Sequence, residues 1–316
     1  MRFALMTEPQ QGLTYDEILA LARAAEAAGL EAFFRSDHYA SFPGPTGLPT
    51  TDAWATLAGL ARDTSTIRIG SLVSPVTFRV PGTFAKQVAT VDEMSGGRVE
   101  VGMGAGWNDE DHHQLGIPFP PLKERYDRLE EALAIVHGLW TEPDGWNYRG
   151  ATWQVTDALF RPRPTAGGRR HPNLILGGEG GPRLARLVAT YADEFNRTSA
   201  SPANVRDAYA RVRAACAAAR RDPDSIVLSA MVGVLVADSQ TEMRDRLRQQ
   251  VAFVGSSSSA EQWLAKRQDR WIMGTPDQAR QRIEEFAAAG VQRIMLQDFL
   301  PRDLDMVALL GPIANA

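Results

Sequence analysis

The feature that most constrains the fold of this chain is the regular alternation of short apolar runs with amphipathic helical segments along its 316 residues. Runs of this kind are typical of parallel strands that are covered by helices. The expected strands are Phe3–Met6, Ala32–Arg35, Ile67–Val73, Val99–Gly104, Asn173–Gly177, Glu194–Arg197, Val227–Val236 and Arg293–Phe299. The pattern therefore indicates eight strand–helix units in succession.

Two of the helical segments carry clear start and stop signals. Thr14 and Glu17 have the spacing of a capping box, and the helix that they open is expected to end at Gly29. A second box begins at Thr275, has proline at the first helical position and leads to Gly290. Because a helix follows each strand, the sequence predicts an α/β fold, a closed (β/α)8 TIM barrel.

The main alternative is an open, Rossmann-like sheet, which requires a glycine fingerprint directly after the first strand. That position reads Thr7-Glu8-Pro9-Gln10, so the fingerprint is absent. The chain is expected to form a single domain, 1–316, with two insertions. The first, 141–172, contains a candidate hairpin at Thr152–Phe160. The second, 253–273, contains a glycine–serine run that predicts a mobile lid over the substrate side of the cofactor, and a surface segment packed against the outside of the barrel is the alternative.

Composition excludes several classes of protein. The apolar fraction of 44% and the charged fraction of 23% are those of a soluble globular protein. The net charge of −4, with both signs interspersed, argues against a nucleic-acid partner. No apolar stretch is long enough for a membrane span or a signal peptide, so a cytoplasmic enzyme is expected. The single cysteine, Cys216, is interpreted as a structural helix residue, and the adjacent His112 and His113 do not indicate a metal site.

A histidine and an aspartate follow the second strand. In barrels of this type the reaction takes place at the carboxyl ends of the strands. His38 is the only histidine expected directly at such an end, and histidine changes its charge near neutral pH, as a general acid or base must. We therefore expect His38 to be catalytic and Asp37 to orient it. A purely structural Asp–His pair is the alternative.

Glycines follow the fourth strand, at Gly104 and Gly106, with Trp107 next to them. Glycines that alternate along a strand leave a face without side chains, so a flat ring can approach the backbone. We expect these three residues to bind a cofactor and His112 to line the same pocket. Tight strand packing is the alternative explanation for the glycines.

A second glycine cluster follows the fifth strand and opens a helix. It contains Gly177, Gly178, Glu179 and Gly180, with Arg183 close by. The free N–H groups and the positive dipole end of a helix suit a phosphate, so this turn is expected to hold the phosphate of a cofactor. A tight turn without a ligand is the alternative.

Taken together, these segments resemble the luciferase-like monooxygenase superfamily, and in particular its branch of coenzyme F420-dependent oxidoreductases. The similarity is dense from Met1 to about Asn196 and looser afterwards. The matching stretches are Phe34–His38, Ser65–Gly70, Met94–Trp107, Arg125–Trp140, Ile175–Gly181 and Tyr191–Asp193.

The resemblance implies how the barrel binds its cofactor. It implies a non-prolyl cis peptide between Leu72 and Val73, next to Ser74, as a support for the tricyclic ring of a flavin or deazaflavin. It also implies that His38 accepts a proton, as the matching histidine does in sugar-phosphate-oxidising relatives. Those relatives have a glutamate where this chain has Trp107, so the role of that glutamate is not carried over.

Three functions follow from these expectations. The first is hydride transfer between coenzyme F420 and a small organic substrate, since a deazaflavin is restricted to hydride chemistry. The second is an FMNH2-dependent monooxygenase supplied by a separate reductase. The third is a barrel that binds a flavin without turnover. The resemblance also allows a homodimer, which is common among relatives.

Overall fold

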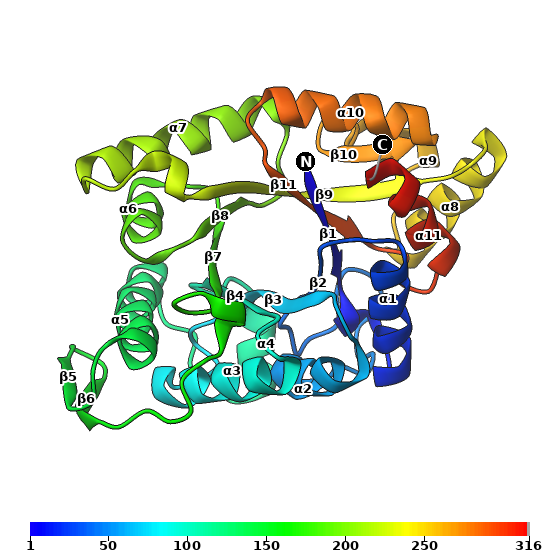
Figure 1. Ribbon diagram of the computed structural model, residues 1–316. Coiled ribbons are helices and arrows are strands. Elements are labelled where there is room, and N and C mark those ends of the chain that lie inside the picture. Colours follow the sequence, from blue (N-terminus) through cyan, green and yellow to red (C-terminus); the bar gives the residue numbers. More distant parts are fainter. Residues whose placement is uncertain (315–316) are drawn as a thin grey trace.

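The computed structural model describes residues 1–314, in which eight parallel strands close into a barrel (Figure 1). Pairing of β8 with β9 and of β11 with β1 completes the ring. The TIM barrel predicted from the sequence is thus confirmed. The barrel strands are β1 (Arg2–Thr7), β2 (Ala32–Arg35), β3 (Arg68–Pro75), β4 (Val99–Gly104), β7 (Asn173–Gly178), β8 (Glu194–Arg197), β9 (Val227–Val236) and β11 (Arg293–Asp298).

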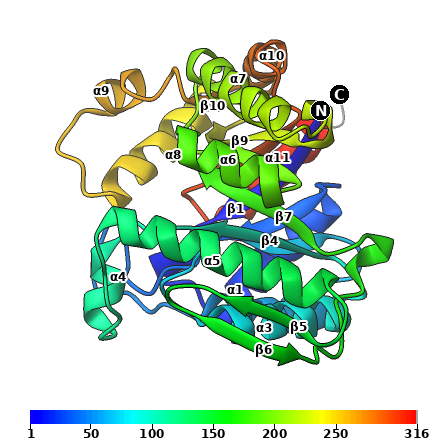
Figure 2. The same cartoon turned by 90° about the vertical axis from the view of Figure 1, so that its left-hand side faces the viewer.

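Helices surround the barrel, and the short helices α4 and α9 lie at the end opposite the N-terminus (Figure 2). The capping box at Thr14 is confirmed, because the Glu17 N–H donates to the Thr14 hydroxyl and the Thr14 N–H donates to the Glu17 carboxylate. No described helix is both long and apolar enough to cross a membrane. The helices are α1 (Tyr15–Ala27), α2 (Ala53–Asp63), α3 (Pro81–Ser95), α4 (Asp109–Gln114), α5 (Leu122–Thr141), α6 (Pro182–Tyr191), α7 (Pro202–Ala218), α8 (Gln240–Phe253), α9 (Ala260–Ala265), α10 (Pro276–Ala288) and α11 (Leu304–Ala314).

The first insertion forms a hairpin on the outside of the barrel, against α5 (Figure 1). Its strands are β5 (Trp146–Arg149) and β6 (Gln154–Ala158), so the hairpin begins before the predicted Thr152. The Glu131 carboxylate on α5 accepts N–H bonds from three successive residues of the turn, 151–153, and this fixes the turn in place.

The second insertion is more ordered than a free lid. It includes α9 and a ninth strand, β10 (Trp271–Gly274), which pairs in parallel with β9. Trp263 on α9 is buried and contacts Trp271 edge to face, with ring centroids 5.1 Å apart. The predicted lid over 253–273 is therefore anchored by secondary structure at both ends. Mobility stays a prediction for residues 254–259, which have no regular structure.

Side chains fill the barrel, so it has no open bore for a ligand. A small apolar cluster occupies the interior, made of Ala4, Met6, Ala32, Phe34, Leu72, Ile175 and Met295. The large core lies between the strands and the helices. At the amino ends of the strands, Arg293 closes the barrel through ion pairs with Glu100 and Glu194. The amino end of the barrel is thus occupied by charged side chains that pair with one another.

A candidate active site at the carboxyl ends of the strands

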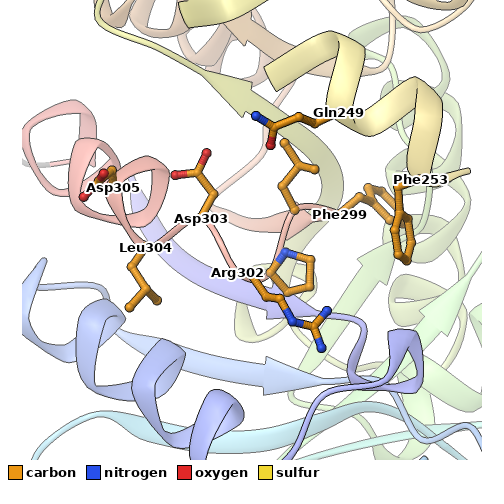
Figure 3. Close-up of a pocket in the computed structure, with 9 residues that line it drawn as sticks. Gln249, Phe253, Phe299, Arg302, Asp303, Leu304 and Asp305 are labelled. Carbon is orange, nitrogen blue, oxygen red and sulfur yellow. The ribbon is translucent and has the colours of Figure 1, made fainter. Parts of the chain in front are cut away.

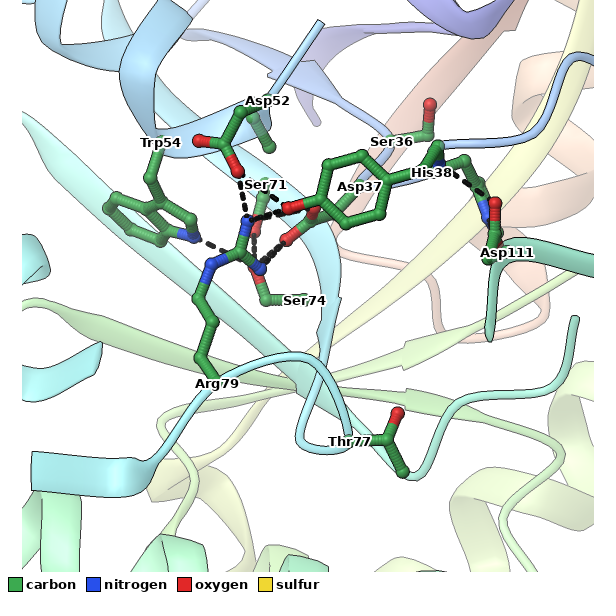
Figure 4. A network of polar contacts seen from close by, with 12 residues as sticks. Ser36, Asp37, His38, Asp52, Trp54, Ser71, Ser74, Thr77, Arg79 and Asp111 are labelled. Atoms are coloured by element: carbon green, nitrogen blue, oxygen red, sulfur yellow. Dashed lines mark hydrogen bonds and ion pairs between the residues drawn. The ribbon is translucent and has the colours of Figure 1, made fainter. Parts of the chain in front are cut away.

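His38 lies just beyond β2, and its ring is held by a buried carboxylate. The Nδ1 atom of His38 is 2.6 Å from Oδ2 of Asp111, which comes from α4 (Figure 4). The other oxygen of Asp111 accepts N–H bonds from Tyr39 and Ala40, at 2.8 and 2.6 Å. Burial raises the pKa of Asp111, but these hydrogen bonds outweigh it and keep that pKa below its usual value. A carboxylate only accepts, so Nδ1 carries a proton.

The opposite nitrogen of His38, Nε2, has no hydrogen-bond partner within residues 1–314. The His38 side chain is 13% exposed, so this nitrogen is available to a ligand at the rim. A histidine with one nitrogen fixed by a carboxylate and the other free has the arrangement of a general acid or base.

Asp37 does not orient His38, contrary to the prediction. Its carboxylate accepts two hydrogen bonds from Arg79, at 2.6 and 3.2 Å, and one from the Ser74 hydroxyl at 2.6 Å (Figure 4). Ser74 in turn accepts a hydrogen bond from the indole N–H of Trp54 at 2.9 Å. Asp37 and Ser74 therefore lie inside the protein framework that supports the loop, next to the site but with their polar atoms already occupied.

Arg79 ties the loops after β2 and β3 together. Besides Asp37, its guanidinium contacts Asp52 at 2.7 Å and the Tyr39 hydroxyl at 3.1 Å. Burial lowers the pKa of Arg79, but the two carboxylates raise it above the usual arginine value. The charge of Arg79 is thus permanent, and the network fixes the chain on either side of His38.

Two aromatic side chains contact the ring of His38. Its ring centroid lies 4.6 Å from that of Phe42 and 5.6 Å from that of Trp107, and both contacts are edge to face. Trp107 is 67% exposed, which is unusual for so large an apolar side chain. Trp107 thus lies beside His38 with much of its ring exposed, and its contact with a cofactor stays a prediction.

Val73 lies over the glycines of β4 and β7. The peptide bond between Leu72 and Val73 is cis, as the resemblance implies. A Cβ added at Gly104 would lie 2.7 Å from a methyl group of Val73, and one at Gly177 would lie 3.1 Å away. The glycines therefore make room for the Val73 side chain, and Val73 rather than bare backbone presents the apolar surface. Gly106 has a φ of 80° and forms a tight turn instead.

His112 is placed differently from the expectation that it lines the pocket. It is completely buried, with Nδ1 2.7 Å from the Asn108 carbonyl oxygen and Nε2 2.7 Å from the Thr77 hydroxyl. A carbonyl only accepts, so Nδ1 carries the proton and Nε2 accepts from Thr77. Burial lowers the pKa of His112, which favours this neutral form. His112 thus positions Thr77, and no ring nitrogen is left for a ligand.

The glycine turn after β7 has the backbone expected of a phosphate loop. Gly178 and Gly180 have φ angles of 149° and 73°, which other residues rarely adopt. Gly181 is the N-cap of α6, without a side-chain cap, and a Cβ there would meet nothing within 4 Å. Glu179 is exposed beside them. The first N–H groups of α6 are therefore not covered by a capping side chain.

Arg183 does not face this turn. Its guanidinium forms ion pairs with Asp127 and Glu130 on α5, at 2.7 and 2.9 Å. The cation that contacts the turn is Arg211 on α7, which donates to the Gly180 carbonyl oxygen at 2.8 Å. The expected arginine is thus replaced by one that is distant in sequence.

A buried carboxylate that the sequence did not single out follows β1. Glu8 accepts hydrogen bonds from the amide groups of Gln10 and Gln297, at 2.7 and 2.5 Å. Gln10 also accepts a hydrogen bond from Ser36, two residues before His38. Glu8 is the first residue after β1, and Asp111 lies on α4, which follows the loop after β4. An acidic residue after the carboxyl end of a barrel strand is the sequence signal that could have identified both.

The fold defines a class of protein, the parallel (β/α)8 barrel, with a candidate site at the carboxyl ends of its strands. Within that class, the chain belongs to the luciferase-like monooxygenase family, whose model matches residues 1–293. This confirms the family resemblance inferred from the sequence.

Relatives of known function fall into two groups. An F420-dependent glucose-6-phosphate dehydrogenase of Amycolatopsis mediterranei is 31% identical over 185 residues, which cover 58% of this chain and 53% of that protein. An FMNH2-dependent dimethylsulfone monooxygenase of Pseudomonas putida is 27% identical over 240 residues, covering 68% of this chain and 65% of that protein. The chain thus spans between half and two thirds of the length of these relatives.

Solved structures agree with the fold. An F420-dependent secondary alcohol dehydrogenase, in complex with an F420-acetone adduct, superposes with a TM-score of 0.83 over 99% of this chain and 97% of that chain. The sequence identity is 19%. At this identity the similarity establishes the architecture and leaves substrate and cofactor to the residues of the site.

Proposed function

We propose that the protein is an oxidoreductase that transfers a hydride between coenzyme F420 and a small organic substrate. The observation that carries this proposal is the pair of His38 and Asp111, which leaves Nε2 of His38 free at the rim of the barrel. The F420-dependent relative of Amycolatopsis mediterranei supports the choice of cofactor.

The residues at the rim fit a deazaflavin. The uncapped start of α6 at Gly181 has space and N–H groups for a phosphate. The apolar surface of Val73, which packs on Gly104 and Gly177, suits the face of a planar ring. When bound, the coenzyme supplies the two-electron hydride chemistry that no amino-acid side chain provides.

The side chains at the site then transfer the proton and exclude water. Nε2 of His38 gives a proton to, or takes one from, the substrate oxygen. Asp111 holds Nδ1–H and stabilises the positive charge that the ring acquires when Nε2 is protonated. Phe42 and Trp107 border the His38 ring and limit the access of water to it.

A second candidate is an FMNH2-dependent monooxygenase that works with a separate reductase. The observation in its favour is the match to the dimethylsulfone monooxygenase, which is longer than the match to the dehydrogenase. The same glycine turn would hold the phosphate of FMN. The two candidates therefore differ in the cofactor and share the site.

A binding titration of the purified protein against both cofactors, each oxidised and reduced, tests the proposal. We expect F420 to bind more tightly than FMN. Micromolar or tighter binding of FMN, about −8 kcal/mol, with no detectable binding of F420 would overturn the choice of F420. Failure of both to bind would exclude both candidates.

A further inference from the structure

A cavity of about 390 Å³ lies beside the rim, between the ends of β9 and β11 and the second insertion. Three cations line it, Lys266, Arg267 and Arg270, together with Trp271 and Phe299. No aspartate or glutamate lines this cavity. The cavity is therefore positively charged, although the whole chain carries a net charge of −4.

Within residues 1–314, none of these three cations forms an ion pair, although they lie close together around one cavity. Arg79 and Arg246, in contrast, are paired with carboxylates. Arg267 lies against an aromatic face, 3.8 Å from the ring centroid of Trp263. Burial and the neighbouring charge of Arg270 both lower the pKa of Arg267. An anion in the cavity would relieve this repulsion.

Two stacked aromatic side chains line the cavity beside the cations. The rings of Trp271 and Phe299 are stacked, with centroids 5.4 Å apart and an angle of 12° between their planes. Trp271 lies directly on the backbone of β9, since a Cβ at Gly233 would collide with its indole ring. Cations next to a planar apolar wall suit an organic anion with a planar or apolar body.

A second cavity, of about 450 Å³, adjoins the first. It shares Lys266, Arg267, Trp271 and Phe299 with it and is also lined by Pro43. Pro43 follows Phe42 in the chain, and Phe42 contacts the His38 ring. The cations are thus near the loop that carries His38, which is compatible with a substrate that uses both.

A larger cavity, of about 520 Å³, is a weaker candidate (Figure 3). It is lined by Phe253 of α8, by Phe299 and by the segment 300–305 that follows. Two of the three charged groups that line it are paired inside the protein. Arg302 pairs with Glu17 at 2.7 Å, and Asp303 pairs with Arg246 at 2.6 Å. The third is the carboxylate of Asp305, so this cavity offers no unpaired cation to an anionic ligand.

We propose that Lys266, Arg267 and Arg270 bind the anionic group of an organic acid whose body lies on Trp271 and Phe299. The anion is a carboxylate or a phosphate, and it belongs either to the substrate or to the acidic tail of the deazaflavin. The assignment to the substrate rests on the proposed function. The anion site itself rests on the geometry of the cavity.

Benzoate is a suitable probe, and benzyl alcohol is the uncharged control of similar shape. Both are titrated calorimetrically into the protein without cofactor. We expect benzoate to bind more tightly, and the double variant Lys266→Gln/Arg270→Gln to weaken benzoate binding about tenfold or more, as expected for the loss of charge-assisted bonds. Binding of benzyl alcohol should not change. Arg206→Gln, at an exposed position on α7, is the matched control and should bind benzoate normally.

The same double variant is then titrated with F420. Loss of affinity for benzoate alone assigns the site to the substrate, and loss of affinity for F420 alone assigns it to the tail of the cofactor. Unchanged binding of both overturns the proposal, as does equal binding of benzoate and benzyl alcohol. Because the benzoate titration uses neither cofactor nor turnover, its result can be read even if the proposed hydride transfer is wrong.

Discussion

Both ends of the barrel carry paired charges, and the carboxyl end also carries groups that have no partner in the described part of the chain. At the amino end, Arg293 is completely buried and its guanidinium contacts Glu100 at 2.7 Å and Glu194 at 3.1 Å. At the carboxyl end, Nε2 of His38 lacks a partner within residues 1–314, and the cations around Arg270 have no ion pair there. Charges that are paired inside the protein hold the fold together, whereas unpaired charges at the rim are available to ligands.

The pKa values reflect the same division. Burial raises the pKa of Glu100, but the paired guanidinium groups of Arg293 and Arg68 outweigh it and bring that pKa to about 2. Burial and the nearby charge of Glu100 raise the pKa of Glu194 above its usual value, although Arg293 lowers it. Removal of Arg293 would therefore leave the buried Glu194 without a cation, whereas Glu100 would keep Arg68.

The largest expected effect is on the chemistry at the rim. His38→Ala should lower the single-turnover rate by ~10²–10⁴, the usual range for loss of a positioned acid–base group. Affinity for the cofactor should stay nearly unchanged, whereas the free energy of unfolding should fall by a smaller amount than is expected below for Arg293→Met, because buried Asp111 loses one hydrogen-bond partner. The measurement is stopped-flow kinetics with an accepted substrate, beside equilibrium unfolding. An unchanged rate would show that His38 only lines the pocket.

The matching variant at the amino end should have the reverse effect. Arg293→Met should lower the free energy of unfolding by about 3–5 kcal/mol, as expected when one partner of a buried ion pair is removed. Cofactor affinity per folded molecule should be preserved. Urea denaturation measures the stability. Arg161→Met, which removes an arginine from an exposed ion pair with Asp144, is the control and should be neutral.

The stability lost in Arg293→Met should also depend on pH. In folded Arg293→Met, the pKa of Glu194 should lie further above that of the unfolded chain, because Glu194 loses its one ion-pair partner within residues 1–314. Such a group stabilises the fold below the unfolded pKa and loses that stabilisation as the pH rises through the folded pKa. The deficit of the variant should therefore shrink as the pH falls from neutrality towards about 5. A deficit independent of pH would mean that lost packing, and not the stranded carboxyl group, destabilises the variant.

A smaller effect is expected at the glycine turn. Gly181→Asp places a good N-cap at the start of α6, in a position where a Cβ has free space, so stability should hold or rise. The same carboxylate should repel a bound phosphate and weaken cofactor binding about tenfold. Gly181→Asn has the same shape without the charge and is the control. If the two variants bind the cofactor equally, the phosphate lies elsewhere.

The barrel was predictable because each strand can be recognised from a short continuous segment of the sequence. Each one is a short apolar run, and the position of His38 at the end of β2 follows from the run itself. The structure extends β3 to Pro75, beyond the predicted Val73, because pairing with β4 continues past the irregularity between Ser71 and Ser74. Such differences do not change which residues reach the rim.

The partners of the site residues were not predictable in the same way. Asp37 is adjacent to His38 in sequence, but consecutive residues after a strand point in different directions, and its carboxylate turns to Arg79. Asp111 reaches His38 from 73 residues away, across two further strand–helix units. Contacts of this kind depend on closure of the barrel, which periodicity alone does not describe. The same applies to Arg211 at the glycine turn.

The smallest effect concerns the two insertions, both of which are longer than the barrel repeat. They differ in how well their backbone is fixed. Residues 254–259 have no regular structure, and Ser256 and Ser258 line a cavity next to the rim. The turn at 150–153 is held by Glu131 on the outer side.

We expect bound cofactor and benzoate to slow amide hydrogen exchange at 254–259 by less than about tenfold, and to leave 150–153 unchanged. Trp271–Met273 should be protected already, because β10 pairs with β9. Equal exchange at 254–259 with and without ligands would rule out a lid, whereas new protection at Trp271–Met273 would mean that β10 opens too and that the lid is as long as the sequence suggested.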